Sequence, residues 1–246
     1  MVSDKAIKHM KKAGIALDGL KYPKHLAFSC GGHNKWAAEK KKTLPEVYSA
    51  IFEKINDVVA LQTKYDVPII TVYLLTSRVH KSHHFNELMD RLTDFFERLS
   101  KNADVFKNKI KISILGKWYD LPSKVVEPIK KIIDETRDYD SFFLNLCINY
   151  DGQDEIVDAC KLILRRVQAE KADIETIDQE MIKDNLYSSY FLPPNMIVRM
   201  GGSKTLNGFL LWDSTRSIIY FSDQYWQDFD EKEFLRAIKY YQDNKK

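Results

Sequence analysis

A glycine pair flanked by polar side chains is the first segment of this sequence that could do chemistry. The segment FSCGGHNKW (28–36) contains Gly31 and Gly32, followed by His33 and Lys35. Glycines permit close approach of a ligand to the backbone, and the free N–H groups at the start of a following helix favour an anion. The segment is therefore either an anion-binding turn or an ordinary tight turn between a strand and a helix.

A second glycine pair lies within the segment IVRMGGSKTLNGFLLW (197–212). Its GGSKT stretch resembles the end of a nucleotide-binding P-loop, but Ser203 stands where that loop has a glycine, and the upstream glycine is missing. A nucleotide P-loop is therefore not expected. What remains is a glycine turn that either binds a diphosphate or is solvated, formed by Gly201 and Gly202 with Arg199 and Lys204.

Histidine and cysteine side chains supply two possible metal sites, and neither is complete. Cys30 and His33 have the spacing of metal ligands, but no second pair follows, so a four-ligand zinc site is not expected. His80, His83 and His84 form a cluster that could bind metal or phosphate, but an exposed polar loop explains it more simply. The sequence therefore predicts no metal ligands.

Composition and charge place the chain among cytoplasmic globular proteins. Its 246 residues carry 38 Lys and Arg against 35 Asp and Glu, a net charge of +3 that is too balanced for a nucleic-acid-binding surface. Three widely separated cysteines fit a reducing compartment better than a disulfide framework. The N-terminus lacks the apolar core of a signal peptide, and no run approaches the roughly 20 apolar residues of a membrane span. We expect peripheral contact with a membrane at most.

Strand and helix patterns alternate along the whole sequence. Apolar runs predict strands at 25–30, 67–76, 109–115, 141–150, 195–200 and 217–222. Helical spacing predicts a short first helix capped by Ser3 and Asp4, and later helices at about 45–59, 88–99, 122–137, from 152, at 178–187 and from 230. We therefore expect one α/β domain over residues 1–246, with a largely parallel six-stranded sheet, helices on both faces, and ligands outside the carboxyl ends of the strands.

Four segments resemble, in order, the sequence blocks of the cis-prenyltransferases, the family that includes undecaprenyl diphosphate synthase. They are HLAFSCGGHNKWA, ITVYLLTS, LNLCINYDGQDEIVDA and MIVRMGGSKTLNGFLLWDSTRSIIYFS with WQDFDEKEFLRAI, and together they span residues from about 25 to 241. The resemblance implies the cis-prenyltransferase fold, a dimer, and a hydrophobic tunnel for a growing polyprenyl chain. It also implies an allylic diphosphate held at the first block and isopentenyl diphosphate held with Mg²⁺ at the last.

The acidic Mg²⁺ anchors of the family are missing at the matching positions. Active members read Met-Asp-Gly-Asn-Gly-Arg-Trp in the first block, so their catalytic aspartate corresponds to Gly31. Their downstream glutamate corresponds to Ile218. Neither residue can hold a cation or move a proton, and metal stabilisation of a departing diphosphate contributes several kcal/mol. We therefore predict no catalytic residue and no cofactor, except Mg²⁺ bound through a substrate diphosphate.

Only some of the family residues that bind diphosphate are present in this sequence. In the last block the first arginine survives as Arg199, while the second arginine and the serine become Thr205 and Asn207. In the second block SRVH replaces Ser-Glu-Asn-Trp, which places Arg78 at the position of the glutamate, and Ser82 stands at the position of a nearby arginine. The resemblance and the residue types together predict diphosphate binding by Gly32, His33, Lys35, Arg199, Gly201, Gly202 and Lys204.

A sequence that keeps the family fold pattern but lacks the acidic Mg²⁺ ligands resembles the non-catalytic subunits of heteromeric cis-prenyltransferases, such as the Nogo-B receptor. TLNGFLLW (205–212) resembles the Thr-Leu-Gly-Phe-Leu-Pro-Trp segment of that subunit type, although this sequence ends in YYQDNKK and not in the Arg-x-Gly tail of those subunits. The resemblance implies a pseudoenzyme that forms a heterodimer with a catalytic subunit and supports polyprenyl diphosphate synthesis in isoprenoid biosynthesis.

Two alternatives to the partner-subunit hypothesis remain open. One is a self-sufficient diverged prenyltransferase or terpene synthase that acts on allylic prenyl diphosphates by altered chemistry, with a homodimer as its assembly. The other is a lipid-binding protein without chemistry. In each case ordinary condensation of isopentenyl diphosphate by this chain alone is not expected.

Overall fold

A single parallel sheet organises the part of the chain that the computed structural model describes, residues 22–81, 83–169 and 173–245. Its strand order is β3-β4-β2-β1-β5-β6. The strands are β1 (His25–Ser29), β2 (Ile69–Tyr73), β3 (Ile110–Leu115), β4 (Phe142–Cys147), β5 (Met196–Arg199) and β6 (Ile218–Phe221). Every neighbouring pair is parallel, so all carboxyl ends lie along one edge, and the predicted six-stranded sheet is confirmed.

All six strands are shorter than the sequence pattern predicted, and β2 and β4 lose the most because the chain leaves the sheet early. β2 ends at Tyr73, and the N–H groups of Leu74 and Leu75 both donate to the carbonyl of Cys147. β4 ends at Cys147, and Asn149 adopts a positive φ of 50°. The apolar residues that follow β2 consequently reach the carboxyl edge of the sheet, where Leu74 and Leu75 line a cavity.

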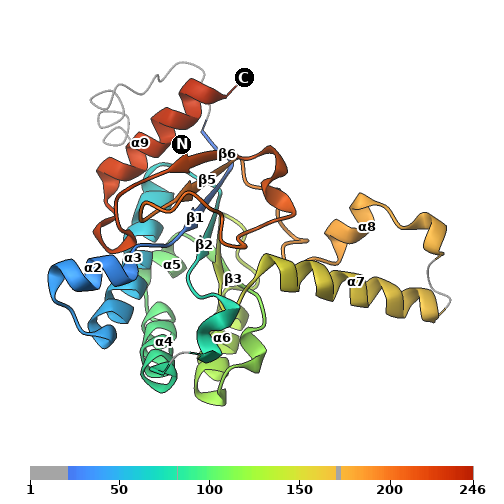
Figure 1. The fold of residues 1–246 in the computed structure, drawn as a ribbon, viewed down its shortest axis with the longest axis horizontal. Helices are drawn as coiled ribbons and strands as arrows, with labels where there is room; N and C mark the ends of the chain where they lie inside the picture. The colour runs from blue at the N-terminus through green and yellow to red at the C-terminus, as the bar shows by residue number, and fades with distance from the viewer. Residues whose placement is uncertain (1–21, 82, 170–172, 246) are drawn as a thin grey trace.

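Eight α-helices connect the strands in the described residues (Figure 1). They are α2 (His33–Lys40), α3 (Leu44–Lys64), α4 (Phe85–Leu99), α5 (Ala103–Lys107), α6 (Ser123–Thr136), α7 (Gly152–Gln168), α8 (Gln179–Asp184) and α9 (Glu231–Asn244). The helix predicted after Ser3 lies outside the described residues. None of the described helices combines the length and the apolar character that crossing a membrane requires.

The two faces of the sheet bury different amounts of apolar surface. Leu26 and Phe28 of β1 point into the larger core, which contains the buried side chains of α3, α4, α6 and α9. Ala27, between them, points to the opposite face and a smaller core. Irregular segments contribute most of the cover on that second face, including Phe209 and the partly buried Tyr187. The helices therefore pack mainly on one face of the sheet.

Helices α7 and α8 project from the body of the molecule as an arm (Figure 1). α7 begins where the Asp151 side chain accepts a hydrogen bond from the N–H of Gln153, a favoured N-cap arrangement. The arm is tied to the segment after β5 by Lys183 of α8, whose Nζ lies 2.8 Å from Oδ2 of the buried Asp213. The same nitrogen donates to the carbonyl of Ser188. A largely buried ion pair therefore links the arm to the sheet.

Candidate functional site

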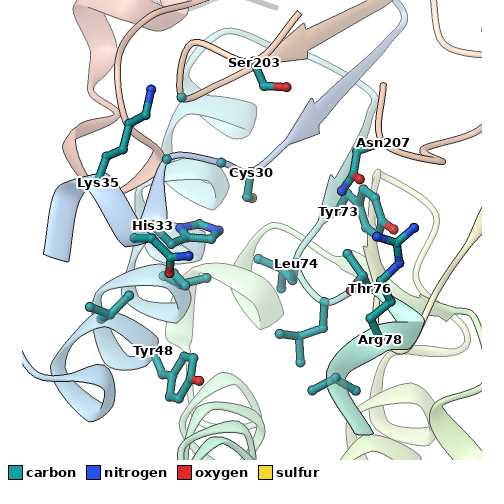
Figure 2. A pocket seen from close by; sticks show the side chains of 18 of the residues that line it. Cys30, His33, Lys35, Tyr48, Tyr73, Leu74, Thr76, Arg78, Ser203 and Asn207 are labelled. Atoms are coloured by element: carbon teal, nitrogen blue, oxygen red, sulfur yellow. The ribbon is translucent and has the colours of Figure 1, made fainter. Parts of the chain in front are cut away.

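A cavity of about 550 Å³ opens at the carboxyl ends of β1, β2 and β5, where the alternation of strands and helices predicts ligands. Helices α2 and α3 form one side of it, and the segment after β2 forms the other (Figure 2). Its volume is that of a small-molecule site. The predicted site residues that line it are Gly31, Gly32, His33, Lys35, Arg199, Gly201 and Gly202. The structure thus brings together two glycine pairs that lie far apart in the sequence.

The two glycine pairs contact each other directly through their backbones. A Cβ on Gly201 would collide with the carbonyl carbon of Gly31 and the nitrogen of Gly32. Gly32 and Gly201 each have a φ of 82°, in the left-handed region that favours glycine. These glycines therefore allow the chain segments after β1 and β5 to pack closely.

Hydrogen bonds within the chain already use the N–H groups of the second glycine pair. Gly201 donates to the carbonyl of Gln224 at 2.8 Å, and Gly202 donates to the carbonyl of Ser222 at 3.0 Å. These two amides line the wall but are not free to bind a phosphate. The start of α2 differs, because no side chain caps it and the N–H groups of its first turn precede the first intrahelical bond. Free amides for an anion are therefore found at α2.

Arg199 is the buried cation of the cavity. Only 7% of the residue is exposed, and its guanidinium donates from Nε to the carbonyl of Thr205 and from Nη1 to that of Cys30, both at 2.9 Å. Burial lowers the pKa of Arg199, but a guanidinium keeps its charge at neutral pH. A Cβ added to Gly31 would lie 2.5 Å from Nη1 and 2.5 Å from the carbonyl oxygen of Met200. The structure therefore leaves no space for a side chain at position 31.

His33 is held as a neutral ring at the start of α2. The amide Nε2 of Gln227 lies 2.9 Å from its Nδ1, so the ring accepts there and carries its proton on Nε2. Burial, with a smaller contribution from the charge of Arg199, lowers the pKa of His33 to about 4, although the bond to Gln227 opposes the shift. At neutral pH, His33 therefore offers the cavity a polar group and no charge.

Of the two predicted lysines, only Lys35 belongs to the cavity. It lines the cavity from α2 (Figure 2). Lys204 is not among the described residues that line the cavity, because its Nζ lies 3.2 Å from Oδ1 of Asp223 and 5.7 Å from the ring centroid of Phe221. The structure does not bring Lys204 together with the other predicted residues, since the contacts of its side chain are with β6 and the loop that follows it.

The segment after β2 contributes a cation that the sequence did not single out as ligand-binding. Arg78 lines the cavity on the side opposite Lys35 and extends toward Tyr73 and Asn207 (Figure 2). Burial raises the pKa of Tyr73, whereas the charges of Arg78 and Arg199, which line the same cavity, lower it. The position of Arg78 shortly after a central strand was the signal that could have identified it.

The three clustered histidines lie outside the cavity. The ring of His80 packs on Phe85 with 5.4 Å between the ring centroids. His84 is exposed, with its Nδ1 3.2 Å from Oε2 of Glu87, and His83 is also exposed. Among the described residues, no three His, Cys, Asp or Glu side chains gather as a metal site.

The remaining wall of the cavity is apolar. Leu44, Val47 and Ile51 of α3 line it together with Leu75 and Val79 from the segment after β2. The cavity therefore combines cationic groups at the strand ends with an apolar surface next to them. This combination suits an anionic head group attached to an apolar chain.

Mg²⁺ does not fit the residues of the cavity. Proteins hold Mg²⁺ through carboxylates and other oxygen ligands, and no Asp or Glu is among the described residues that line this cavity. Ile218, which the sequence resemblance aligned with the family glutamate, begins β6 and pairs with Met196 at the amino edge of the sheet, away from the cavity. The structure therefore does not bring positions 31 and 218 together, and we assign no step to a metal here.

Comparison with known proteins is consistent with this architecture. Residues 30–246 match the family model described as putative undecaprenyl diphosphate synthase. The chain is 32% identical over 222 residues to a tritrans,polycis-undecaprenyl-diphosphate synthase (geranylgeranyl-diphosphate specific) of Thermoplasma acidophilum, with 89% of this chain and 86% of the relative covered. It is 29% identical over 236 residues to an isoprenyl transferase of Clostridium tetani, with 95% and 92% covered.

A solved structure has the same fold. Lavandulyl diphosphate synthase from Lavandula x intermedia, in complex with dimethylallyl diphosphate, matches with a TM-score of 0.85 at 22% sequence identity. The match covers 89% of this chain and 95% of that chain. The family model extends over both glycine pairs and all the other residues that line the cavity. On these grounds the chain belongs to the undecaprenyl diphosphate synthase family, the cis-prenyltransferases.

Proposed function

We propose that this chain is a non-catalytic subunit that pairs with a catalytic cis-prenyltransferase in the cytoplasm and supports polyprenyl diphosphate synthesis by that partner. Its own cavity retains the ability to bind a prenyl diphosphate. The observation that carries the proposal is the closed space beside Gly31, where any side chain would meet Arg199 and the carbonyl of Met200. Position 31 corresponds to the catalytic aspartate by its resemblance to the first family block, which supports a site that lacks both the carboxylate and the space for it.

The expected effect on catalysis is large. Departure of a diphosphate from an allylic carbon requires that its developing charge be stabilised, and metal ions supply several kcal/mol of that stabilisation in the family reaction. Each 1.36 kcal/mol corresponds to a factor of about ten in rate. Loss of the metal anchors therefore reduces condensation by many orders of magnitude, while the fold needed for pairing persists.

Reconstitution with a catalytic cis-prenyltransferase from the same organism tests this proposal. The chain alone, the partner alone and the mixture are assayed for Mg²⁺-dependent elongation of farnesyl diphosphate with labelled isopentenyl diphosphate, and their masses are measured in solution. We expect no elongation by the chain alone, a heterodimer in the mixture, and faster elongation than by the partner alone. Elongation by the chain alone, or a mixture with no heterodimer and unchanged activity, would contradict the proposal.

A second candidate function is that of a self-sufficient enzyme that acts on allylic prenyl diphosphates by altered chemistry. The observation that favours it is the open cavity of about 550 Å³ with cationic and apolar parts, which pairing alone does not require. Incubation of the purified chain with labelled geranyl, farnesyl and geranylgeranyl diphosphates, with and without Mg²⁺, tests this candidate. A new product supports it, and quantitative recovery of all three substrates excludes it.

A further inference from the structure

The charge of the cavity has a single sign. Lys35, Arg78 and Arg199 line it, and no acidic side chain is among its described lining residues. A cavity lined by charges of one sign concentrates ions of the opposite sign. Such a cavity attracts a phosphate group, but it offers a divalent cation none of the anionic oxygen ligands that would replace its water.

Arg199 is a donor whose hydrogen bonding is incomplete. Its Nε and Nη1 donate to carbonyl oxygens of Thr205, Ser29 and Cys30. The remaining nitrogen, Nη2, has no hydrogen bond to any residue that the structure describes, although only 7% of Arg199 is exposed. Nη2 is not among the fully buried side-chain atoms that lack a partner, so this nitrogen remains accessible, and an anion in the cavity would supply its acceptor. The three backbone carbonyls hold this donor in a fixed position.

Arg78 provides a second guanidinium in the wall of the cavity. It is exposed, and it forms no ion pair within the described part of the chain. Figure 2 shows its side chain directed toward Tyr73 and Asn207, across the cavity from Lys35. Tyr73 lines the same cavity, and the charges of both Arg78 and Arg199 lower its pKa. Two guanidinium groups that line one cavity can together contact the several oxygens of a diphosphate.

The opposite side of the cavity adds further donors. Lys35 lies in the first turn of α2, whose N–H groups have no side-chain cap. The apolar side chains Val47 and Ile51 of α3 continue the wall beyond this polar end. A ligand that fills the cavity therefore needs an anionic group at one end and an apolar chain at the other.

We propose that this cavity binds the diphosphate group of a prenyl diphosphate without a divalent cation, with Arg78 and Arg199 supplying the positive charge and the wall of α3 contacting the prenyl chain. The inference rests on the proposed use of the cavity for a prenyl diphosphate. It concerns this chain alone and does not depend on a partner subunit.

Calorimetric titration of the purified full chain tests the inference. Farnesyl diphosphate and inorganic pyrophosphate are each titrated in EDTA and again in excess Mg²⁺. We expect both ligands to bind in EDTA, with farnesyl diphosphate the tighter because of its apolar chain. We expect Mg²⁺ to leave the affinity unchanged or to weaken it, because the metal neutralises part of the ligand charge. Binding that requires Mg²⁺, or that strengthens at least about tenfold with it, would overturn the inference.

Substitution of Arg78 provides the residue-level test, because this side chain is exposed and its loss leaves no buried group unpaired. We expect R78Q to weaken binding in EDTA by at least about tenfold, since charge-assisted hydrogen bonds are lost. R78K should bind with intermediate affinity, because it keeps the charge but lacks the planar fork. K204Q is the matched control: it removes a nearby lysine that does not line the cavity, and it should bind like the wild type.

The outcomes separate this inference from the proposed partner role. R78Q binding with wild-type affinity, or no binding of either ligand to the wild type in EDTA, would show that the inference is wrong while leaving the heterodimer untouched. Failure to form a heterodimer, with metal-free binding intact, would remove the partner role and leave the inference standing. Unfolding midpoints equal to that of the wild type confirm that the variants are folded.

Discussion

Gly31 and Arg199 share one small space at the end of β1. The guanidinium reaches across from β5 and donates to the carbonyl of Cys30, next to Gly31. This arrangement is possible only because position 31 has no side chain, since a Cβ there would lie 2.5 Å from Nη1 and from the carbonyl oxygen of Met200. The absence of a side chain at position 31 and the burial of the Arg199 guanidinium are therefore coupled.

Substitution of Gly31 is the first prediction at this scale. We expect G31A to lower the free energy of unfolding by about 1–3 kcal/mol, because the added methyl group overpacks a site bounded by a backbone carbonyl. G31D should be destabilised similarly and should not gain Mg²⁺-dependent elongation activity. Urea denaturation and the elongation assay provide the measurements.

The matched control for G31A is G202A. Its Cβ meets nothing closer than Oδ1 of Asp223 at 3.5 Å, although its φ of 74° is unfavourable for alanine. We expect G202A to lower the free energy of unfolding by about 1–2 kcal/mol, which is the cost of placing alanine at that φ. A G31A variant as stable as the wild type would show that the protein accommodates a methyl group at position 31.

His33 gives a prediction about pH. Burial lowers its pKa in the folded chain from 6.5 to about 4, so between these values the unfolded chain binds a proton that the folded chain does not. Stability therefore falls as the pH falls through this window. Between about pH 7 and pH 5, the free energy of unfolding of the wild type should fall by about 1–2 kcal/mol more than that of H33N, because the asparagine cannot take up the proton.

Urea denaturation across this pH range checks the histidine prediction. The asparagine side chain is chosen because it can still pair with the amide of Gln227. His25, whose pKa burial also lowers to about 4, contributes equally in all variants and cancels from the comparison. H83N, at an exposed histidine, should follow the wild type, and identical pH profiles for H33N and the wild type would contradict the prediction.

At the scale of elements, α2 is positioned by the segment that follows β6. The indole Nε1 of Trp36 donates to Oδ1 of Asp228 at 3.0 Å, and the hydroxyl of Tyr225 donates to Glu39. The N–H of Trp226 donates to the carbonyl of Gly31 at 3.2 Å, just before the helix. The cavity wall at α2 is thus held by residues close to the C-terminal end of the chain.

Removal of the Trp36 partner tests this dependence. We expect the amide protons of α2 in D228A to exchange about five- to tenfold faster than in the wild type, because one tertiary hydrogen bond no longer opposes local opening. Hydrogen exchange followed by mass spectrometry measures the effect on residues 33–40. D223A, in the same segment but paired with Lys204 at the surface, should leave that exchange unchanged. Equal exchange of the α2 amide protons in D228A and D223A would show that the hydrogen bond between Trp36 and Asp228 does not stabilise α2.

At the scale of the whole molecule, the arm of α7 and α8 is joined to the body by several polar contacts, among them the Lys117–Asp158 ion pair and a buried one at Asp213. Lys183 connects α8 to Asp213, whose side chain is only 4% exposed, and to the carbonyl of Ser188. A buried carboxylate without its counter-ion is strongly unfavourable. This ion pair therefore contributes to stability beyond the usual small effect of a surface pair.

The ion pair gives the last prediction. We expect K183M to lower the free energy of unfolding by about 2–4 kcal/mol, because Asp213 stays buried without its cation. The double variant K183M/D213N should recover part of this loss, since it removes the buried charge as well. Urea denaturation of both variants and the wild type provides the test. A K183M variant within about 0.5 kcal/mol of the wild type would show that Asp213 is effectively solvated.

The sequence by itself determined the sheet and the family. Apolar runs alternating with helical patterns predicted all six strands, because a strand buried on both faces needs a continuous apolar segment, and short length with β-branched residues favours a strand over a buried helix. Only the ends of the strands were predicted wrongly. β2 ends before Leu74 although that residue is apolar, and β4 ends before Asn149, which adopts a positive φ. The collinear blocks also identified the family, which is confirmed, and they predict that a catalytic carboxylate is missing at Gly31, which stays a prediction.

The tertiary structure alone decided which residues share the cavity. Sequence spacing grouped Lys204 with Arg199, but a turn of two glycines directs Lys204 to Asp223 and the outer surface. Sequence spacing did not select Arg78, which reaches the cavity from the segment after β2, a strand two positions from β5 in the sheet. Nor could it show that Arg199 fills the space beside Gly31. These facts depend on side-chain direction and on contacts between segments far apart in the chain, which residue type and spacing do not encode.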